Sequence, residues 1–158
     1  MDAAARRSRG KSVWDILLGL QLGVIGAILM IIWFALISPI LGHPWWFIPN
    51  LFASHFYNSR DVLLGPGIVT IVGIAVQIVT SGIVGSLNGL VTPGGRLSGI
   101  AAATTWYVFC LLFLWKRIAP LLLMQAIQPI LWAGYFLLGS ALGWHRHLIK
   151  ARRATLAG

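Results

Sequence analysis

The sequence contains very few acidic residues and very few cysteines. Its 158 residues include only three acidic side chains, Asp2, Asp15 and Asp61, and a single cysteine, Cys110. One cysteine excludes an internal disulfide and any paired-cysteine redox or zinc site. The scattered aspartates exclude membrane phosphatidyltransferases, which need several together, and the absence of glutamate excludes exporters that need a membrane-embedded Glu.

Charge of either sign is also scarce. Charged residues make up 9% of the chain and hydrophobic residues 58%, whereas soluble domains carry about 25% charged and about 45–50% apolar residues. A water-soluble fold of this size cannot bury so much apolar surface. We therefore expect lipid to be the solvent and the chain to be an integral membrane protein.

Four apolar stretches are long enough to cross a hydrocarbon core of about 30 Å. Because they are continuous rather than alternating, they predict helices and not the strands of a barrel. We expect one all-α, polytopic domain over 1–158, a bundle of four transmembrane helices with a short interfacial helix between the first two. The predicted spans are 16–41, 67–91, 97–115 and 118–144.

The basic residues predict the topology. Segments 1–14 and 145–158 carry four each, and Arg96 lies in the loop that shares their side, against Arg60 and the pair at 116–117 on the other. The side with both termini carries nine basic residues and the other side carries three. This distribution places both termini in the cytoplasm and the chain in a plasma or inner membrane. Since this charge flanks apolar runs, we expect it to contact anionic headgroups, and we expect no nucleic-acid partner.

The segment 43–58 is too short for a span and too apolar for a solvated loop. It contains six aromatic residues and is interrupted by two prolines. We expect it to form a short interfacial helix that is capped by Asn50 and presents Phe52 and Phe56 on one face. Either it is only an aromatic anchor, or it is a re-entrant lid over a cavity. The predicted anchor residues are Trp45, Trp46, Phe52, His55, Phe56 and Tyr57.

Small residues recur at four-residue spacing on three of the four predicted spans. This spacing lets helix backbones approach closely, although each match alone is weak. Together they favour a tight bundle, a homo-oligomer or a partner membrane subunit. The predicted helix-contact residues are Gly19, Gly23, Ser81, Gly85, Gly89, Gly139 and Gly143.

The apolar cores of the spans contain no Asp, Glu, Lys, Arg or His. This argues against a proton-coupled pump and against histidine pairs that hold haem. The polar groups there are amides and hydroxyls, and Gln125 and Gln128 share one face beside Pro129. They are either a solute site or interhelical hydrogen-bonding groups, and the second reading is the commoner one.

These observations predict a non-catalytic membrane protein. We expect an accessory or structural bundle that binds a partner, a lipid or a hydrophobic cofactor through its small-residue faces. The alternative is a small oligomeric transporter or channel for a polar or neutral solute, built around Gln125 and Gln128. We expect no catalytic residue, no resident cofactor and no metal site, because His43 and His55 lack an acidic partner.

Overall fold

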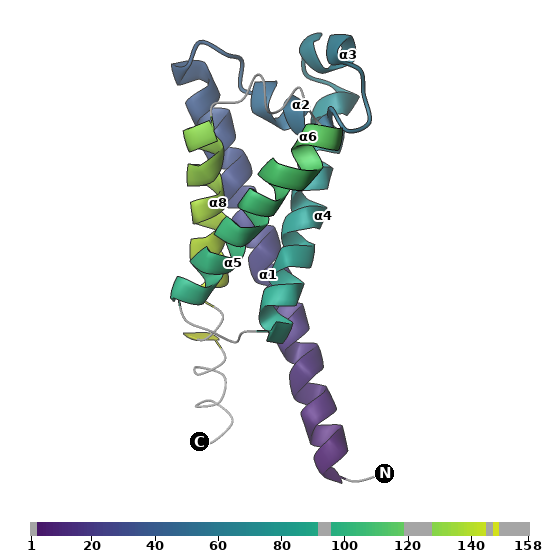
Figure 1. The fold of residues 1–158 in the computed structure, drawn as a ribbon, viewed down its shortest axis with the longest axis vertical. Helices are drawn as coiled ribbons and strands as arrows, with labels where there is room; N and C mark the ends of the chain where they lie inside the picture. Colours follow the sequence, from purple (N-terminus) through teal and green to yellow (C-terminus); the bar gives the residue numbers. More distant parts are fainter. Residues whose placement is uncertain (1–2, 92–95, 119–127, 145–146, 149–158) are drawn as a thin grey trace.

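The fold was analysed in a computed structural model that describes residues 3–91, 96–118, 128–144 and 147–148. Helices account for all the regular structure in these residues (Figure 1). The elements are α1 (Ala3–Ile40), α2 (Phe47–Ala53), α3 (Ser59–Leu63), α4 (Ile68–Val91), α5 (Arg96–Phe109), the π-helical turn η1 (Cys110–Leu114), α6 (Trp115–Ile118) and α8 (Gln128–Leu142).

Three helices are long and apolar enough to cross a membrane. They cover Val13–Ile40, Ile68–Val91 and Leu97–Leu114 and correspond to the first three predicted spans. At 1.5 Å per residue, the 24 residues of α4 are about 36 Å long, enough for a core of about 30 Å. The first helix starts earlier than predicted, because α1 continues back to Ala3 through the basic segment.

The fourth predicted span, 118–144, is described only in part. Residues 119–127 lie outside the described part of the chain, and α8 contributes 15 residues from Gln128 to Leu142. Four crossings therefore remain a prediction.

The four long helices alternate in direction (Figure 1). Gly19 and Gly23 of α1 contact α4 in the reverse order of the α4 sequence, so the two helices are antiparallel. Gly26 contacts Leu138 and Ala141 of α8. Consequently the start of α1 and the end of α8 lie at one end of the bundle, and α2 and α3 lie at the other. We call these the terminal end and the α2 end.

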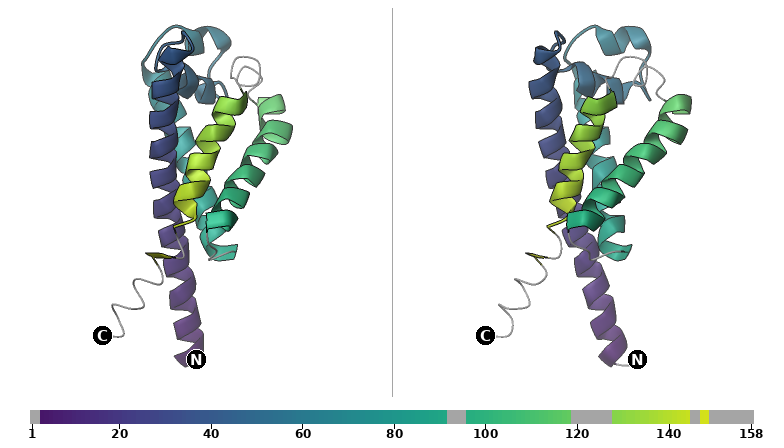
Figure 2. Two further views of the ribbon diagram at one scale, coloured as in Figure 1. Left: turned by 90° about the vertical axis from the view of Figure 1, so that its left-hand side faces the viewer. Right: turned by 60° about the vertical axis from the view of Figure 1, so that its left-hand side comes forward.

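Helix α1 is the centre of the packing. It packs against both α4 and α8, while α5 packs mainly against α8 and only slightly against α4. Figure 2 shows α5 crossing obliquely and leaning away from the other helices toward the α2 end. The core residues at that end are largely aromatic, including Phe34, Phe52, Trp115 and Tyr135.

The segment 43–58 differs from its predicted form. It contains α2, and the chain then turns into a separate five-residue helix, α3. Asn50 lies inside α2 and does not cap it. Phe52 is 4% exposed whereas Phe56 is 69% exposed, so the prediction that they share a face was wrong: α2 ends at Ala53, before the helical spacing reaches Phe56.

Candidate functional site

The predicted small residues of α1 and α4 meet along one seam. A Cβ added at Gly85 would overlap the carbonyl oxygen of Gly19 and lie 2.9 Å from the Cα of Gly23. A Cβ at Gly23 would overlap the carbonyl oxygen of Ser81, and one at Gly89 would lie 3.4 Å from the Cα of Gly19. The backbones are therefore in contact, and no larger side chain fits between them.

The predicted Gly139 in α8 and Gly143 just after it meet α5 in the same way. A Cβ at Gly139 would lie 2.6 Å from the Cα of Ile100, and one at Gly99 would lie 2.9 Å from the Cα of Gly143. Gly99 was not predicted, although Gly99 and Ala103 have the four-residue spacing that identified the others. Both seams lie toward the terminal end of the bundle.

A third close contact joins α2 to α4. A Cβ at Gly73 would overlap the carbonyl oxygen of Pro49 and lie 3.4 Å from the backbone nitrogen of Ala53. All seven residues of α2 are buried. Gly73 has no small residue four positions away, so the spacing rule could not have found it.

Asn50 is the hydrogen-bonding centre of the α2 end. Its side chain is fully buried and donates to the carbonyl oxygens of Val62 and Gly65, each at 2.9 Å. Its oxygen accepts a bond of 2.6 Å from the hydroxyl of Thr70, which in turn accepts from the backbone N–H of Gly67 at 3.2 Å. Every polar group of the amide therefore has a partner. These bonds tie α2 to the end of α3 and to the start of α4.

The predicted polar patch is described only at Gln128, because Gln125 lies outside the described residues. The Tyr107 hydroxyl donates to the side-chain oxygen of Gln128 at 2.9 Å. This bond links α5 to the start of α8, which is what an interhelical hydrogen-bonding residue does.

Sequence reasoning did not identify Gln77 as a central residue. It is buried at 2% exposure, and its side-chain nitrogen donates to the hydroxyl of Ser81 at 3.4 Å and to the sulfur of Met30 at 3.7 Å. Its polarity inside an apolar span was the available signal. At the α2 end, Trp115 packs edge-on against Phe52 and Tyr107, where α5 leans outward.

The predicted anchor residues have different environments. Trp45 and Phe56 are exposed, Trp46 and Tyr57 are partly buried against the core, and Phe52 is inside it. His55 is half-buried, and its Nδ1 is 3.0 Å from the carbonyl oxygen of Phe52, which accepts the bond. Burial lowers the pKa of His55, and this hydrogen bond opposes the shift in part.

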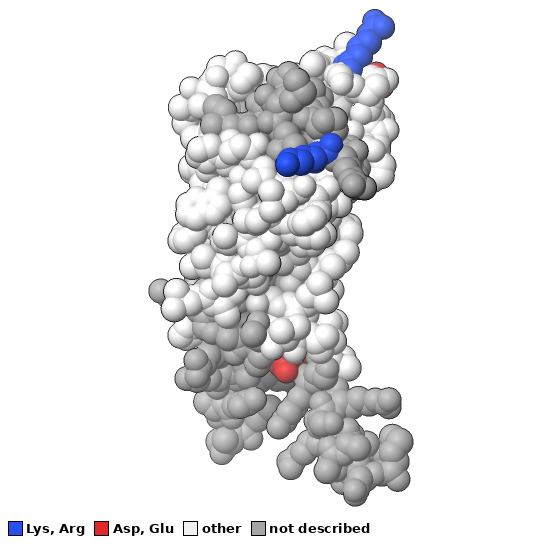
Figure 3. All heavy atoms as spheres, in the orientation of Figure 1, with Lys and Arg blue, Asp and Glu red and all other residues white. Residues whose placement is uncertain are grey.

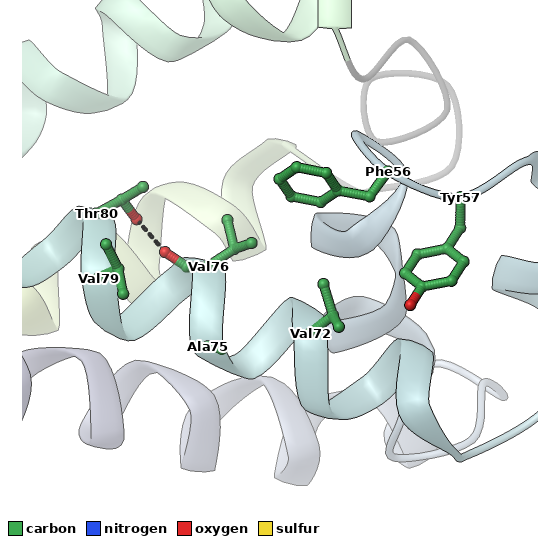
Figure 4. Close-up of a pocket in the computed structure, with 7 residues that line it drawn as sticks. All are labelled: Phe56, Tyr57, Val72, Ala75, Val76, Val79 and Thr80. Carbon is green, nitrogen blue, oxygen red and sulfur yellow. Dashed lines mark hydrogen bonds between the residues drawn. The ribbon is translucent and has the colours of Figure 1, made fainter.

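The outer face of α4 carries two open apolar grooves that share Val79. The upper groove has a volume of about 590 Å³ and is roofed by Phe56 and Tyr57 (Figure 4). The lower groove, about 380 Å³, lies between α4 and Leu20 and Val24 of α1. Its α4 wall includes Ile83 and continues the same exposed side of the helix. The α4 residues that line the two grooves are mostly aliphatic, and the small residues Gly82 and Ser86 lie in the lower groove beside α1.

The chemistry available to the described residues is limited. Nowhere in the ranges 3–91, 96–118, 128–144 and 147–148 do three His, Cys, Asp or Glu side chains come together to hold a metal ion. His43 stacks on Phe47 with ring centroids 4.2 Å apart, so each histidine of this segment has its own partner. The described charged side chains, Asp15, Arg60, Asp61 and Lys116, leave an uncharged band on the face seen in Figure 3.

The observations above define an all-helical protein with three helices that are long and apolar enough to cross a membrane. Comparison of the chain with protein-family models, with curated proteins and with solved structures gives no match.

Proposed function

We propose that the protein is a non-catalytic, multi-pass protein of the plasma or inner membrane that binds a hydrophobic ligand or partner through the outer face of α4. The observation that carries this proposal is the pair of grooves sharing Val79, which together follow α4 from Val72 to Leu87. Ligand sites are concave and predominantly apolar, with volumes of about 300–1,000 Å³, and both grooves fall in that range.

The placement in the membrane is part of the same proposal. The bundle crosses four times, with α1, α4, α5 and the segment 118–144, and both termini face the cytoplasm. Three observations support this placement: the alternating helix directions, the uncharged band (Figure 3) and the nine-to-three distribution of basic residues. The α2 end then lies at the outer surface, with Trp45 and Trp46 near the headgroup layer.

Three buried or partly buried polar groups in the described part of the bundle support a binding role rather than transport. Asn50, Gln77 and Gln128 all bond to other parts of the chain. A solute pathway needs polar groups directed into a cavity, and these three serve helix packing instead. The same reasoning favours a non-enzymatic role, since their partners are carbonyls, hydroxyls and a thioether rather than a base or a nucleophile.

Site-specific photo-crosslinking in native membranes tests the binding role. A photoreactive phenylalanine analogue replaces Val79 in the shared groove or, as the matched control, Ile32, which is 50% exposed on α1. We expect a discrete adduct of defined mass at position 79 and only diffuse lipid labelling at position 32. Identical labelling at both positions would contradict the proposal, because the α4 face would then be ordinary lipid-facing surface.

A further inference from the structure

The membrane span that begins with α5 contains a π-helical turn. Residues Cys110–Leu114 form η1, and the backbone N–H of Trp115 donates to the carbonyl oxygen of Cys110, five residues earlier. Such turns are rare, occur mostly as single turns inside α-helices and are frequent at functional sites. Because η1 takes up one residue more than an α-helical turn, it changes which of the following side chains face the core.

The π-helical turn is what places Trp115 in the core. Ala103, Tyr107 and Cys110 are buried, and their steps of four and three residues keep them on one face of an α-helix. Trp115, which is 2% exposed, follows Cys110 by five residues. Five α-helical residues turn by about 500°, which is about 140° away from the direction of Cys110. In an unbroken α-helix, Leu114 would take the inner position and Trp115 would face outward.

The outer turn of this span is attached to the bundle through Trp115. Among the described elements, α6 packs chiefly on η1, its own neighbour in the chain, and α5 leans outward at this end (Figure 2). The ring centroid of Trp115 lies 6.4 Å from that of Phe52 in α2 and 6.4 Å from that of Tyr135 in α8. Leu114 is partly buried against the same core. Two adjacent side chains can therefore serve as the inward contact of this turn.

Outside the core, a second suitable environment exists for Trp115. It directly follows the apolar stretch Leu97–Leu114, and the next residue, Lys116, is exposed. In the proposed membrane placement this is the level of the outer headgroups, where tryptophan is enriched because its ring is apolar and its N–H is polar. An outward rotation would thus move the indole from packed rings into the headgroup layer rather than into water.

We propose that η1 is a one-residue hinge that moves Trp115 between the core and the outer headgroup layer. In the inner state, which is the one described above, the π-helical turn takes up the extra residue and Trp115 packs on Phe52 and Tyr135. In the outer state η1 is α-helical, Leu114 takes the inner position, and these two rings are uncovered toward the outer leaflet. The inference rests on the proposed membrane placement but not on the ligand of the α4 face.

Chemical labelling of the single cysteine tests this hinge. Cys110 is buried one π-helical turn before Trp115, so the departure of the indole should expose it to N-ethylmaleimide. The full chain is labelled in nanodiscs and the adduct is followed by mass spectrometry. The control is Cys110→Ala/Phe113→Cys, which moves the thiol to a position of η1 that is 61% exposed. Since minor states are populated at about 0.1–10%, we expect wild type to label at that fraction of the control rate. A slower or an equal rate would overturn the hinge.

Deletion of Leu112 removes the extra residue from η1. The tryptophan then follows Cys110 by four residues, so a continuous α-helix keeps it in the core and the outer state is lost. We expect the Tm of wild type and labelling at least about tenfold slower than in wild type. Deletion of Ile83 is the matched control, because Ile83 in the regular helix α4 is 52% exposed and Leu112 is 48% exposed. It should lower the Tm strongly, since it rotates the residues that follow it. Unchanged or faster labelling in a folded Leu112 deletion would overturn the hinge.

The double variant Leu114→Trp/Trp115→Leu decides the test if the Leu112 deletion does not fold. It keeps the length of the chain and also places a tryptophan four residues after Cys110, so labelling should again be slower than in wild type. An unchanged or faster rate would overturn the hinge, as would failure of both variants to fold, because both keep a tryptophan in the core. A discrete adduct at Val79 combined with unchanged labelling would overturn only the hinge and leave the binding role intact.

Discussion

The two ends of the bundle are packed by opposite means. At the terminal end, backbones touch directly at glycines, as at Gly19 against Gly85 and at Gly99 against Gly143. At the α2 end the helices diverge, and large rings such as Phe52 and Trp115 fill the space with α2 between them. The comparison teaches that the terminal end is held by glycine contacts that leave no room for a larger side chain, while the α2 end, apart from the contact of Gly73 with Pro49, depends on large side chains that fill the space.

The largest effect is expected at the glycine seam, from Gly85→Leu. The new side chain would meet the backbone of α1, which cannot move aside as a flexible side chain can. We expect a loss greater than the roughly 1–3 kcal/mol typical of overpacking, seen as aggregation or a large fall in Tm in detergent. Ile83→Leu introduces the same residue on the exposed face of α4, where Ile83 is 52% exposed, and should change Tm little. An equal fall in Tm in Gly85→Leu and Ile83→Leu would show that the close contact between α1 and α4 does not contribute to stability.

The aromatic end should instead fail when atoms are removed. Trp115→Ala deletes a ring that packs on Phe52, Tyr107 and Tyr135, and such truncations cost about 3–5 kcal/mol. Thermal unfolding in detergent measures the loss. The control Trp132→Ala removes the same ring from a site that is 46% exposed. If this control were as damaging, the described cluster would not be what closes the α2 end.

A smaller effect is expected from Asn50→Ala. The substitution leaves the carbonyl oxygens of Val62 and Gly65 without their donor, and a buried unsatisfied group costs about 1–3 kcal/mol. Limited proteolysis between α2 and α4, together with Tm, reports the loosening. Asn58→Ala removes only an exposed cap of α3 and should leave the proteolysis pattern of wild type. Faster cleavage in both variants would argue that α3 rather than Asn50 holds the segment.

The smallest effect is a pH dependence at the α2 end. Because burial lowers the pKa of His55 below its ordinary value of 6.5, the folded state favours the neutral ring. Stability is therefore full above about pH 6.5 and declines as the pH falls below it, since the unfolded chain takes up the proton first. The decline in Tm between pH 7.5 and 5.5 should be reduced in His55→Gln. An unchanged decline would assign the acid sensitivity to other groups.

The two ends also differ in how much the sequence reveals. Four-residue spacing alone identified Gly19, Gly23, Ser81, Gly85 and Gly89, and the structure adds their partners. The burial of α2 was not predictable, because it depends on Asn50 reaching Gly65 and on Pro49 meeting Gly73, contacts between residues distant in sequence. A local pattern of aromatics and prolines is the same for a surface anchor and for a buried helix.

Comparing reporter fusions at residue 158 and within 58–65 tests the central claim most directly. The account has the terminal end in the cytoplasm and the α2 end outside, with four crossings between the two chain ends. A periplasmic or extracellular reporter should be active only in the 58–65 insertion, and a cytoplasmic reporter only at residue 158. Activity of both fusions on the same side of the membrane would contradict the four-crossing arrangement.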